Sequence, residues 1–501
     1  MNPLSDAIVQ PLSNREDAVL VLQDGSAVSG VSLFEMTGRI SNALKFLGVR
    51  PGDRVAMQAD KSHYSLALYL ACLRSGVLFL PLNTAYTDAE LEYFIGDSGA
   101  KVVVCDPLRR EGLGQVAEAH AAQLLTLAHD GSGTLLELAD DQSSEFDDAE
   151  RDADDLVAIL YTSGMTGRSK GAMLTQKNLL SNTESLADAW QFTDEDVLLH
   201  ALPIFHVHGL FVACNLLLKV GGKMIFLPRL NVDQLIQFMP QATTMMGVPT
   251  FYTRLLADER FDANLTSHMR LFISGSAPLL AETHVQFEER TGHKILERYG
   301  MTETSMSTSN PYEGERKAGS VGLVLPGVEA RIVDGSGREV GEQEVGILEV
   351  RGPNVFKGYW QMPEKTAEEF REDGFFITGD MATIDAEGYI SIVGRSKDLI
   401  ISGGYNVYPK EIETEIDLIE GVSESAVFGV PHPDFGEAVI AAIVPKDGFA
   451  VEAGHVTEQL AGKLAKFKQP KKIEFLSELP RNTMGKVQKN ILRNEFKSLF
   501  D

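Results

Sequence analysis

The sequence of 501 residues predicts an α/β protein whose large N-terminal part holds two sheets of parallel type plus a small β-rich subdomain, followed by a small α+β domain. Strand-like and helix-like segments alternate over about the first 390 residues, which is typical of parallel sheets with crossover helices. Short strands and turns take over from about residue 330, and a compact unit of about a hundred residues follows residue 394. A chain of this length exceeds one hydrophobic core, so we expect at least two domains.

Each predicted strand of the large part is a short apolar run. These runs span residues 54–58, 78–82, 101–105, 156–161, 223–227, 244–248 and 271–274. Turns at 334–337 and 385–388 indicate the β-rich subdomain. The last unit has the order helix, strand, strand, helix, strand, over residues 409–417, 425–430, 438–444, 456–463 and 472–475. Between residues 137 and 155, acidic residues without apolar periodicity predict a solvated connection.

The composition excludes several classes of partner. The net charge of −26 disfavours nucleic acid and anionic membranes, because both would repel such a surface. The longest apolar stretches are too short to span a bilayer, and no signal peptide is visible. Cys72, Cys105 and Cys214 lie far apart without metal-ligand spacing, so we expect core residues in a reducing compartment. A cytoplasmic protein without a nucleic-acid or membrane partner is expected.

A Gly-rich and hydroxyl-rich loop, residues 161–171, follows one predicted buried strand. It contains three glycines, four Ser or Thr hydroxyls, one Arg and one Lys. Glycines let backbone N–H groups turn towards one point, and the hydroxyls and Lys170 add donors and positive charge. The loop therefore predicts a phosphate site. It is not a Walker A loop, because Lys170 is followed by Gly171 rather than by Ser or Thr.

Six further motifs follow in order along the chain. They are LPIFH at 202–206, SGSAP at 274–278, ERYGMTET at 297–304, FITGD at 376–380, GRSKD at 394–398 with SGGYN at 402–406, and PRNTMGK at 480–486. Together with the loop they resemble the core motifs of the adenylate-forming superfamily, which includes acyl-CoA synthetases, luciferases and peptide-synthetase adenylation domains. The resemblance covers roughly residues 20–495. It implies a large domain of residues 1–395, a small mobile domain of residues 396–501, ATP and CoA as co-substrates, and Mg²⁺ as cofactor.

The resemblance also implies which residues bind ATP. They are Thr162, Ser163, Gly164, Thr166, Gly167, Lys170, Ser276, Ala277, Glu297, Tyr299, Gly300, Met301, Asp380 and Arg395. Asp380 would accept both ribose hydroxyls, which needs two carboxylate oxygens, and Tyr299 would stack on adenine. Glu303 and Thr166 would hold Mg²⁺, a hard cation that prefers oxygen ligands. Thr302 would touch the α-phosphate.

Lys486 lies in a basic stretch, residues 463–497, that holds ten Lys and Arg against three Glu. This excess suits a small polyanion such as CoA or ATP. By the resemblance, Lys486 stabilises the adenylation transition state, and acylation of its amine would switch the enzyme off. Lys397 would be the hinge about which the small domain rotates. After rotation, CoA would bind at Gly403, Gly404 and Tyr405, because glycine permits a close approach to the backbone.

Arg298 is the sharpest clue to the acyl substrate. It precedes Tyr299, so it would border the acyl pocket, and a buried guanidinium needs an anion. That anion is either a second substrate carboxylate or an internal partner such as Glu297 or Glu303. Ser276 and His206 would add donors, and Val207 and Met306 would flank the substrate carbon next to the reacting carboxylate. His206 is also expected in the catalytic set with Lys486, Glu303 and Thr302.

Residues 83–87, 200–211, 297–311 and 353–363 resemble malonyl-CoA synthetases in particular. The resemblance implies an ATP-dependent ligase that forms malonyl-CoA, AMP and diphosphate through malonyl-adenylate. A ligase for methylmalonate or a monocarboxylate, a peptide-synthetase adenylation domain, and a nucleotide-binding paralogue stay open as alternatives. The last is motivated by Met165, which stands in the phosphate loop where the family usually has Thr or Ser.

Overall fold

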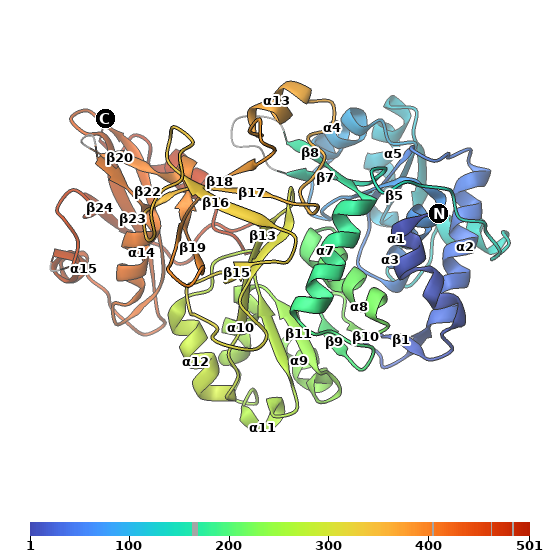
Figure 1. Ribbon diagram of the computed structural model, residues 1–501, viewed down its shortest axis with the longest axis horizontal. Helices are drawn as coiled ribbons and strands as arrows, with labels where there is room; N and C mark the ends of the chain where they lie inside the picture. Colours follow the sequence, from blue (N-terminus) through green and yellow to red (C-terminus); the bar gives the residue numbers. More distant parts are fainter. Residues whose placement is uncertain (163–168, 403–404, 462, 483–484, 501) are drawn as a thin grey trace.

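The computed structural model describes residues 1–162, 169–402, 405–461, 463–482 and 485–500. Four sheets organise these residues. Two large sheets build the N-terminal domain, a four-stranded sheet follows them in the chain, and a smaller sheet belongs to the C-terminal domain (Figure 1). The prediction of an α/β fold with two parallel-type sheets is confirmed. Among the described residues, no helix combines the length and the apolarity that a membrane crossing needs.

The six-stranded sheet is parallel up to its last strand. Its order is β6 (Gln123–Thr126), β5 (Val102–Cys105), β3 (Arg54–Gln58), β4 (Leu78–Pro81), β7 (Leu156–Thr162) and the antiparallel β8 (Lys170–Thr175). Alternate residues of β3 face opposite cores: Val55 and Met57 pack towards α2 (Gly30–Phe46) and α3 (His63–Ser75). Ala56 packs towards α4 (Asp88–Ser98) and α5 (Arg110–Ala119). A strand buried on both faces has a continuous apolar sequence, which is why these runs could be predicted.

The nine-stranded sheet has a parallel centre and antiparallel edges. Its order is β15 (Leu323–Val324), β14 (Ser305–Ser309), β13 (Leu296–Met301), β12 (Leu271–Ser274), β11 (Thr244–Gly247), β9 (Val197–His200), β10 (Lys223–Phe226), β1 (Ala18–Val21) and β2 (Ala27–Ser29). Six of these strands, β13 to β1 in this order, run parallel. All seven predicted strands of the large domain exist, and their ends differ from the predicted ends by one residue at most.

Helices occupy the space between the two large sheets. They are α1 (Pro3–Ile8), α3, α7 (Gln176–Ala189) and α8 (Asn215–Val220), and α1 contacts the other three. One continuous hydrophobic core includes residues of this layer and of both sheets. The helices after β10 cover the other side of the nine-stranded sheet, at the bottom of Figure 1: α9 (Val232–Phe238), α10 (Pro249–Leu256), α11 (Ala263–Thr266) and α12 (Ala281–Thr291).

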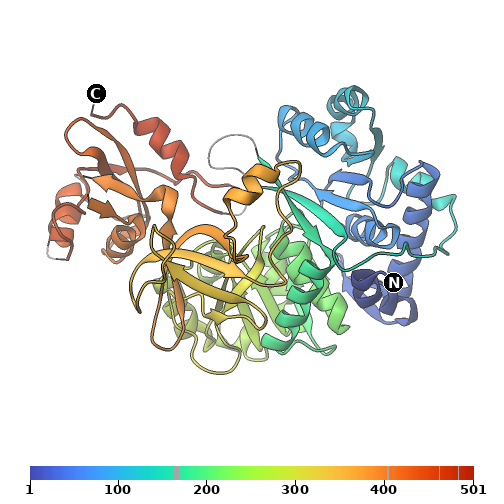
Figure 2. The same cartoon turned by 45° about the horizontal axis from the view of Figure 1, so that its top comes forward.

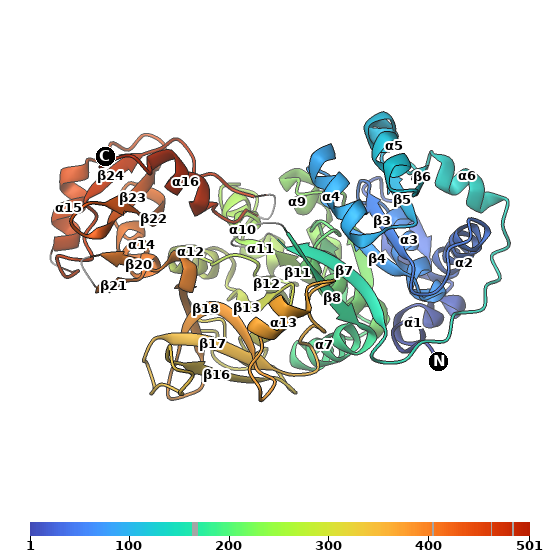
Figure 3. The same ribbon diagram turned by 90° about the horizontal axis from the view of Figure 1, so that it is seen from above.

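The four-stranded sheet is antiparallel: β16 (Glu329–Val333), β17 (Gly346–Arg351), β18 (Phe376–Ile384) and β19 (Ile390–Arg395). The helix α13 (Pro363–Glu368) precedes β18. The predicted β-rich subdomain corresponds to this sheet. A 3₁₀ turn, Ser396–Asp398, then leads into the C-terminal domain. This domain lies beside the four-stranded sheet, on the side away from the six-stranded sheet (Figures 2 and 3).

The C-terminal domain contains every element that was predicted for it. Its elements are β20 (Ile400–Ser402), β21 (Tyr405–Val407), α14 (Pro409–Asp417), β22 (Val422–His432), β23 (Gly436–Pro445), α15 (Ala453–Ala461), β24 (Lys472–Phe475) and α16 (Lys489–Phe496). The long hairpin of β22 and β23 separates two hydrophobic cores. Neither core shares a buried residue with the core of the large domain.

The acidic connection is less solvated than predicted. Arg74 of α3 is only 2% exposed, and its Nε donates to Asp148 at 2.7 Å while Nη2 donates to the carbonyl of Phe146 at 2.6 Å. Nη1 also donates to Thr37 Oγ1 at 3.1 Å. The helix α2 approaches this segment so closely that a Cβ at Gly38 would lie 1.8 Å from the carbonyl oxygen of Ser144. Because the buried guanidinium of Arg74 needs acceptors, it holds the acidic connection against α2 and α3.

We predict that Arg74→Met destabilises the large domain without touching the candidate site. Removing one partner of a buried ion pair costs about 3 kcal/mol. Urea unfolding followed by the fluorescence of the buried Trp190 measures the change. As a matched control, Arg338→Ala removes a guanidinium that is 83% exposed and is expected to change the unfolding free energy by less than about 0.5 kcal/mol. Equal effects of the two substitutions would contradict the prediction.

Candidate active site

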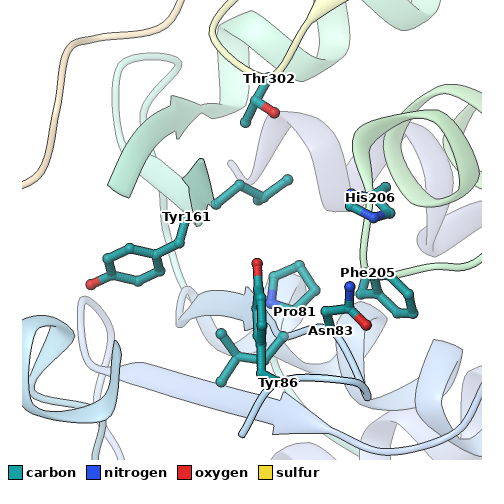
Figure 4. A pocket seen from close by; sticks show the side chains of 9 residues that line it. Pro81, Asn83, Tyr86, Tyr161, Phe205, His206 and Thr302 are labelled. Carbon is teal, nitrogen blue, oxygen red and sulfur yellow. The ribbon is translucent and has the colours of Figure 1, made fainter. Parts of the chain in front are cut away.

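Strands from both large sheets end at one crevice. A small pocket in it is lined by Pro81, Leu82 and Asn83 at the end of β4, by Tyr86, by Leu160 and Tyr161 of β7, and by Phe205, His206 and Thr302. In Figure 4, Tyr86 enters this pocket from below and His206 lies to the right. Ligands of parallel α/β sheets bind at the carboxyl ends of the strands. The crevice is therefore the candidate active site.

Three residues expected at the nucleotide meet in the structure. The carboxylate of Asp380 is buried, accepts a hydrogen bond from the Tyr299 hydroxyl at 2.5 Å and lies 2.7 Å from Arg395 Nε. Pairing of β18 with β19 places Asp380 directly opposite Arg395. Burial and the charge of Asp380 raise the pKa of Tyr299 well above its usual value, so its hydroxyl keeps its proton. This cluster is a preformed polar site.

Glu303 forms a second polar cluster at the end of β7. Its Oε1 accepts hydrogen bonds from Thr162 Oγ1 at 3.3 Å and from the Tyr359 hydroxyl at 3.1 Å. The same Tyr359 hydroxyl lies 2.6 Å from Glu369 Oε2, and Lys170 Nζ lies 2.8 Å from Glu369 Oε1. Burial raises the pKa of Glu303. The structure thus joins Glu303, Thr162 and Lys170, as expected for one phosphate site.

Tyr359 and Glu369 were not among the predicted site residues. Tyr359 lies inside the segment 353–363, whose resemblance to relatives was the available signal. Glu369 follows the end of α13 and carries no recognisable motif. Its position becomes visible only through Lys170, which also lies 4.0 Å from the centre of the Tyr359 ring.

Arg298 is buried without an internal counter-ion. Its side chain is 3% exposed, and Nε and Nη2 have no hydrogen-bond partner among the described residues. Burial lowers the pKa of Arg298 to about 9. Glu297 lies 3.6 Å from His284 instead, and Glu303 receives the two hydroxyls described above. The alternative of an internal ion pair with Glu297 or Glu303 is therefore not realised in this structure.

Glycine makes room for this guanidinium. A Cβ at Gly275 would lie 2.4 Å from Arg298 Cζ, so a larger residue would displace the side chain. Gly275 follows β12, the parallel neighbour of the strand that carries Arg298. The next residue, Ser276, has φ of 72°, a left-handed conformation that residues other than glycine rarely adopt and that is frequent at functional sites. Ala277, also expected at the nucleotide, follows it and is half-buried.

His208 is a site residue that the sequence analysis missed. Its Nδ1 lies 3.3 Å from Ser276 Oγ, and burial together with the charge of Arg298 lowers its pKa well below the usual value. A neutral His208 thus accompanies Ser276 and Arg298. The expected donor His206 faces the pocket lined by Tyr86, and burial lowers its pKa to about 4. The repeated spacing of His206 and His208 was the signal available in the sequence.

Val207 and Met306 are both buried. Met306 lies on β14 and packs against Gly300 of β13. The contact is so close that a Cβ at Gly300 would lie 2.7 Å from Met306 Cε. Gly300 and Met301 belong to the same strand as Arg298 and Tyr299. The residues expected around the acyl group therefore come from adjacent strands and from the segment after β9.

The C-terminal domain presents Lys486 to this crevice. Gly485 lies beside Thr250 of the large domain, where a Cβ would be 3.3 Å from the threonine side chain. A second contact joins Lys446 and Glu282 at 3.2 Å. Lys486 is an exposed residue, but desolvation of its amine by nearby protein atoms, together with the charge of Arg395, lowers its pKa to about 8. The role of Lys486 in adenylation stays a prediction.

Lys397 lies in the 3₁₀ turn that joins the domains and is exposed. Its neighbour Asp398 pairs with Arg493 of α16 at 2.8 Å. Tyr405 is 58% exposed, and its ring stacks on Phe467 at 4.6 Å. Several predicted residues lie outside the described part of the chain: Ser163, Gly164, Met165, Thr166, Gly167, Gly403 and Gly404. Within the described part, no cluster of three or more His, Cys, Asp or Glu could hold a metal ion.

Solved structures with the same fold include MatB from Rhodopseudomonas palustris. The ATP-bound crystal structure is 54% identical to this chain, with all of each chain covered and a TM-score of 0.98. The apo crystal structure of MatB shares the same identity and coverage with a TM-score of 0.86. The arrangement described here is thus closer to that of ATP-bound MatB.

Curated relatives extend over nearly the whole chain. Feruloyl-CoA synthase from an Amycolatopsis species is 36% identical over 96% of each chain. Malonate–CoA ligase from Arabidopsis thaliana is 33% identical over 97% of this chain and 87% of the relative. A family model described as AMP-binding enzyme matches residues 10–360, and the model of its C-terminal domain matches residues 411–486. Because the first of these models covers more than half of the chain, the chain belongs to the family of AMP-binding enzymes.

Proposed function

We propose that this chain is an ATP-dependent malonate:CoA ligase. It joins malonate to AMP, releases diphosphate, and then transfers the malonyl group to CoA. The activities of the relatives, which include a malonate–CoA ligase and a feruloyl-CoA synthase, support an AMP-forming acyl-CoA synthetase. The choice of malonate rests on one observation, the unpartnered guanidinium of Arg298.

A dicarboxylate supplies what Arg298 lacks. One carboxylate of malonate reacts, and the other would accept hydrogen bonds from the guanidinium, whose Nε and Nη2 have no partner among the described residues. Ser276 and the neutral His208 lie beside it and add neutral donors. An aryl or fatty acid would leave the cation buried without an anion, which costs several kcal/mol. Because Val207 and Met306 are apolar, we expect methylmalonate to be a minor substrate.

The polar clusters suit ATP. We assign the ribose to Asp380, the adenine to Tyr299 and the phosphates to Thr302, Lys170 and Arg395. Glu303 suits Mg²⁺, because its buried carboxylate receives only neutral hydroxyls and has no ion-pair partner among the described residues. Thr166, outside the described residues, is proposed as a second ligand. Bound Mg²⁺ would neutralise phosphate charge as the two anions approach.

The reaction proceeds in two steps. In the first, a malonate oxygen attacks the α-phosphorus of ATP and the bond from phosphorus to diphosphate breaks. Lys486 would stabilise the charge that accumulates between the carboxylate and the phosphate. In the second, the CoA sulfur attacks the carbonyl carbon, the thiol proton leaves, and AMP departs with the electrons of the C–O bond.

The chain's two domains would exchange roles between these steps. We place their boundary at residues 395/396, since β19 ends at Arg395 and β20 begins at Ile400. Lys397 between them is proposed as the hinge, and Gly403, Gly404 and Tyr405 as the CoA contact. Acylation of Lys486 would abolish its charge and stop the first step. A cytoplasmic location stays a prediction.

The test of the proposed function is diphosphate release with a panel of carboxylates, ATP, Mg²⁺ and CoA. Malonate is expected to be used with the highest kcat/KM, with malonyl-CoA identified by mass. Preference for acetate or butyrate would indicate a monocarboxylate ligase instead. Preference for an aryl acid such as ferulate would equally reject the proposal.

Arg298 is predicted to set substrate choice. Removing one partner of a desolvated charge pair costs about 3–5 kcal/mol, so Arg298→Ala should lower kcat/KM for malonate by about two to three powers of ten. Butyrate has no second charge and should lose much less, so the malonate/butyrate ratio should collapse. Arg290→Ala, an exposed guanidinium of α12, is the control. Equal losses for both substrates would show that Arg298 only supports the nucleotide wall.

Lys486 is predicted to serve the first step alone. Lys486→Ala should abolish malonyl-adenylate formation while thioester formation from supplied malonyl-adenylate persists, with the exposed Lys497→Ala as control. Since the amine is charged below its pKa of about 8 and neutral above it, the wild-type adenylation rate should fall as the pH rises through about 8. Thioester formation measured in parallel should lack this alkaline limb. Equal loss of both steps in the variant would contradict the assignment.

A further inference from the structure

A buried amine outside the proposed chemistry joins the two large sheets. Lys61, between β3 and α3, is 7% exposed and has no carboxylate partner among the described residues. Its Nζ donates to the carbonyl oxygen of His200 at 2.9 Å and lies 2.7 Å from His200 Nδ1. His200 is the last residue of β9 in the nine-stranded sheet. The remaining face of the amine lies 4.2 Å from the ring centre of Phe226.

The hydrogen bonds fix the proton of His200. Its Nε2 lies 2.8 Å from the carbonyl oxygen of Gly209, which can only accept, so Nε2 carries the proton. Nδ1 faces the amine of Lys61 and accepts from it. The imidazole is therefore neutral, and burial together with Lys61 lowers its pKa well below the usual value.

Gly209 lies in a π-helix, His208–Cys214. Its carbonyl also accepts from Cys214 Sγ at 3.2 Å, and π-helical turns are frequent at functional sites. A Cβ at Gly209 would lie 2.0 Å from the carbonyl oxygen of Pro203, so the intervening segment folds back tightly on the helix. Lys61 thus holds residue 200 directly and residue 209 through the imidazole, which are the two ends of a segment that carries His206, Val207 and His208.

We propose that Lys61 is a positioning residue for the acyl site. Together with His200 it clamps both ends of segment 200–209, and the clamp sets His208 against Ser276 and Arg298. An amine without a counter-ion is costly to bury, and methionine of similar length would fill the same space without this cost. The clamp explains the amine, because only a donor can satisfy both the His200 carbonyl and Nδ1. The identity of the acyl substrate, but not the clamp, rests on the proposed function.

The first measurement compares KM for the carboxylate with KM for ATP in Lys61→Met. Displacement of a positioning segment by about 1 Å can cost powers of ten in efficiency. We expect KM for the carboxylate to rise about tenfold, the malonate/butyrate preference to fall by a similar factor, and KM for ATP to change less than twofold. An undirected loss of stability would not separate the two substrates in this way.

The second measurement needs no turnover. Cys214 is fully buried and contacts His200, while Cys72 is fully buried in α3 and has no hydrogen bond to His200 among the described residues. With the native protein and a maleimide, labelling of Cys214 should accelerate about tenfold in Lys61→Met, whereas labelling of Cys72 should not, because only the clamped segment opens more often. Peptide mass mapping separates the two thiols.

Arg74→Met is the matched control, since it also removes a buried basic side chain of this region, here from α3. It should lower stability while leaving unchanged the carboxylate preference and the ratio of Cys214 to Cys72 labelling. If Lys61→Met fails to fold, a second pair of variants tests the clamp. In His200→Gln, the side-chain amide can still donate to the Gly209 carbonyl, as Nε2 does. In His200→Asn, the shorter amide can only replace Nδ1 as the acceptor for Lys61. The Gln variant should retain more of the preference and of the Cys214 protection.

Unchanged carboxylate KM, preference and Cys214 labelling in Lys61→Met would overturn the clamp, as would equal effects in Arg74→Met or a better performance of the Asn variant. Failure of the proposed function can be told apart from failure of the clamp, because the wild-type enzyme itself would then not prefer malonate. If the wild type activates another acid, the KM of that acid and the labelling of Cys214 still test the clamp.

Discussion

The two large sheets share one layer of helices, and the candidate site depends on that layer. The helices α1, α3, α7 and α8 pack between the sheets within one continuous core, so the sheets cannot shift independently. The carboxyl ends of β7 and β12 therefore face a common crevice although they belong to different sheets. The hydrogen bond from Thr162 to Glu303 crosses this crevice and would not survive a relative displacement of the sheets by a few ångströms.

Three basic side chains around the crevice differ in the partners that the protein gives them. Arg395 is half-buried and is paired with an internal carboxylate, Asp380. Lys61 has neutral acceptors that come from another sheet, which fixes a loop. Arg298 has neither, although the chain carries a net charge of −26 and acidic residues are plentiful. A cation left without a partner in so acidic a protein points to recognition of an external anion.

The sequence predicted most of the fold because the parallel strands are buried on both faces and have continuous apolar runs. It did not predict β14, whose residues Ser305–Ser309 are buried but mostly polar. The hydroxyls of Thr308 and Ser309 find partners that only the folded chain supplies, namely the carbonyl of Val321 and the indole of Trp190. The motifs located Asp380, Tyr299 and Arg395, since their chemistry is local to short segments. His208 and Glu369 could not be assigned in this way, because their roles depend on Ser276 and Lys170, 68 and 199 residues away.

Arg395 occupies a particular place in the chain. It is the last residue of β19 and is opposite Asp380, and the connection between the domains starts one residue later. A ligand that changes the position of this guanidinium therefore also acts on the first backbone dihedral angles of the connection. Such coupling is reciprocal. By whatever factor a nucleotide favours one orientation of the C-terminal domain, that orientation must raise the affinity for the nucleotide by the same factor.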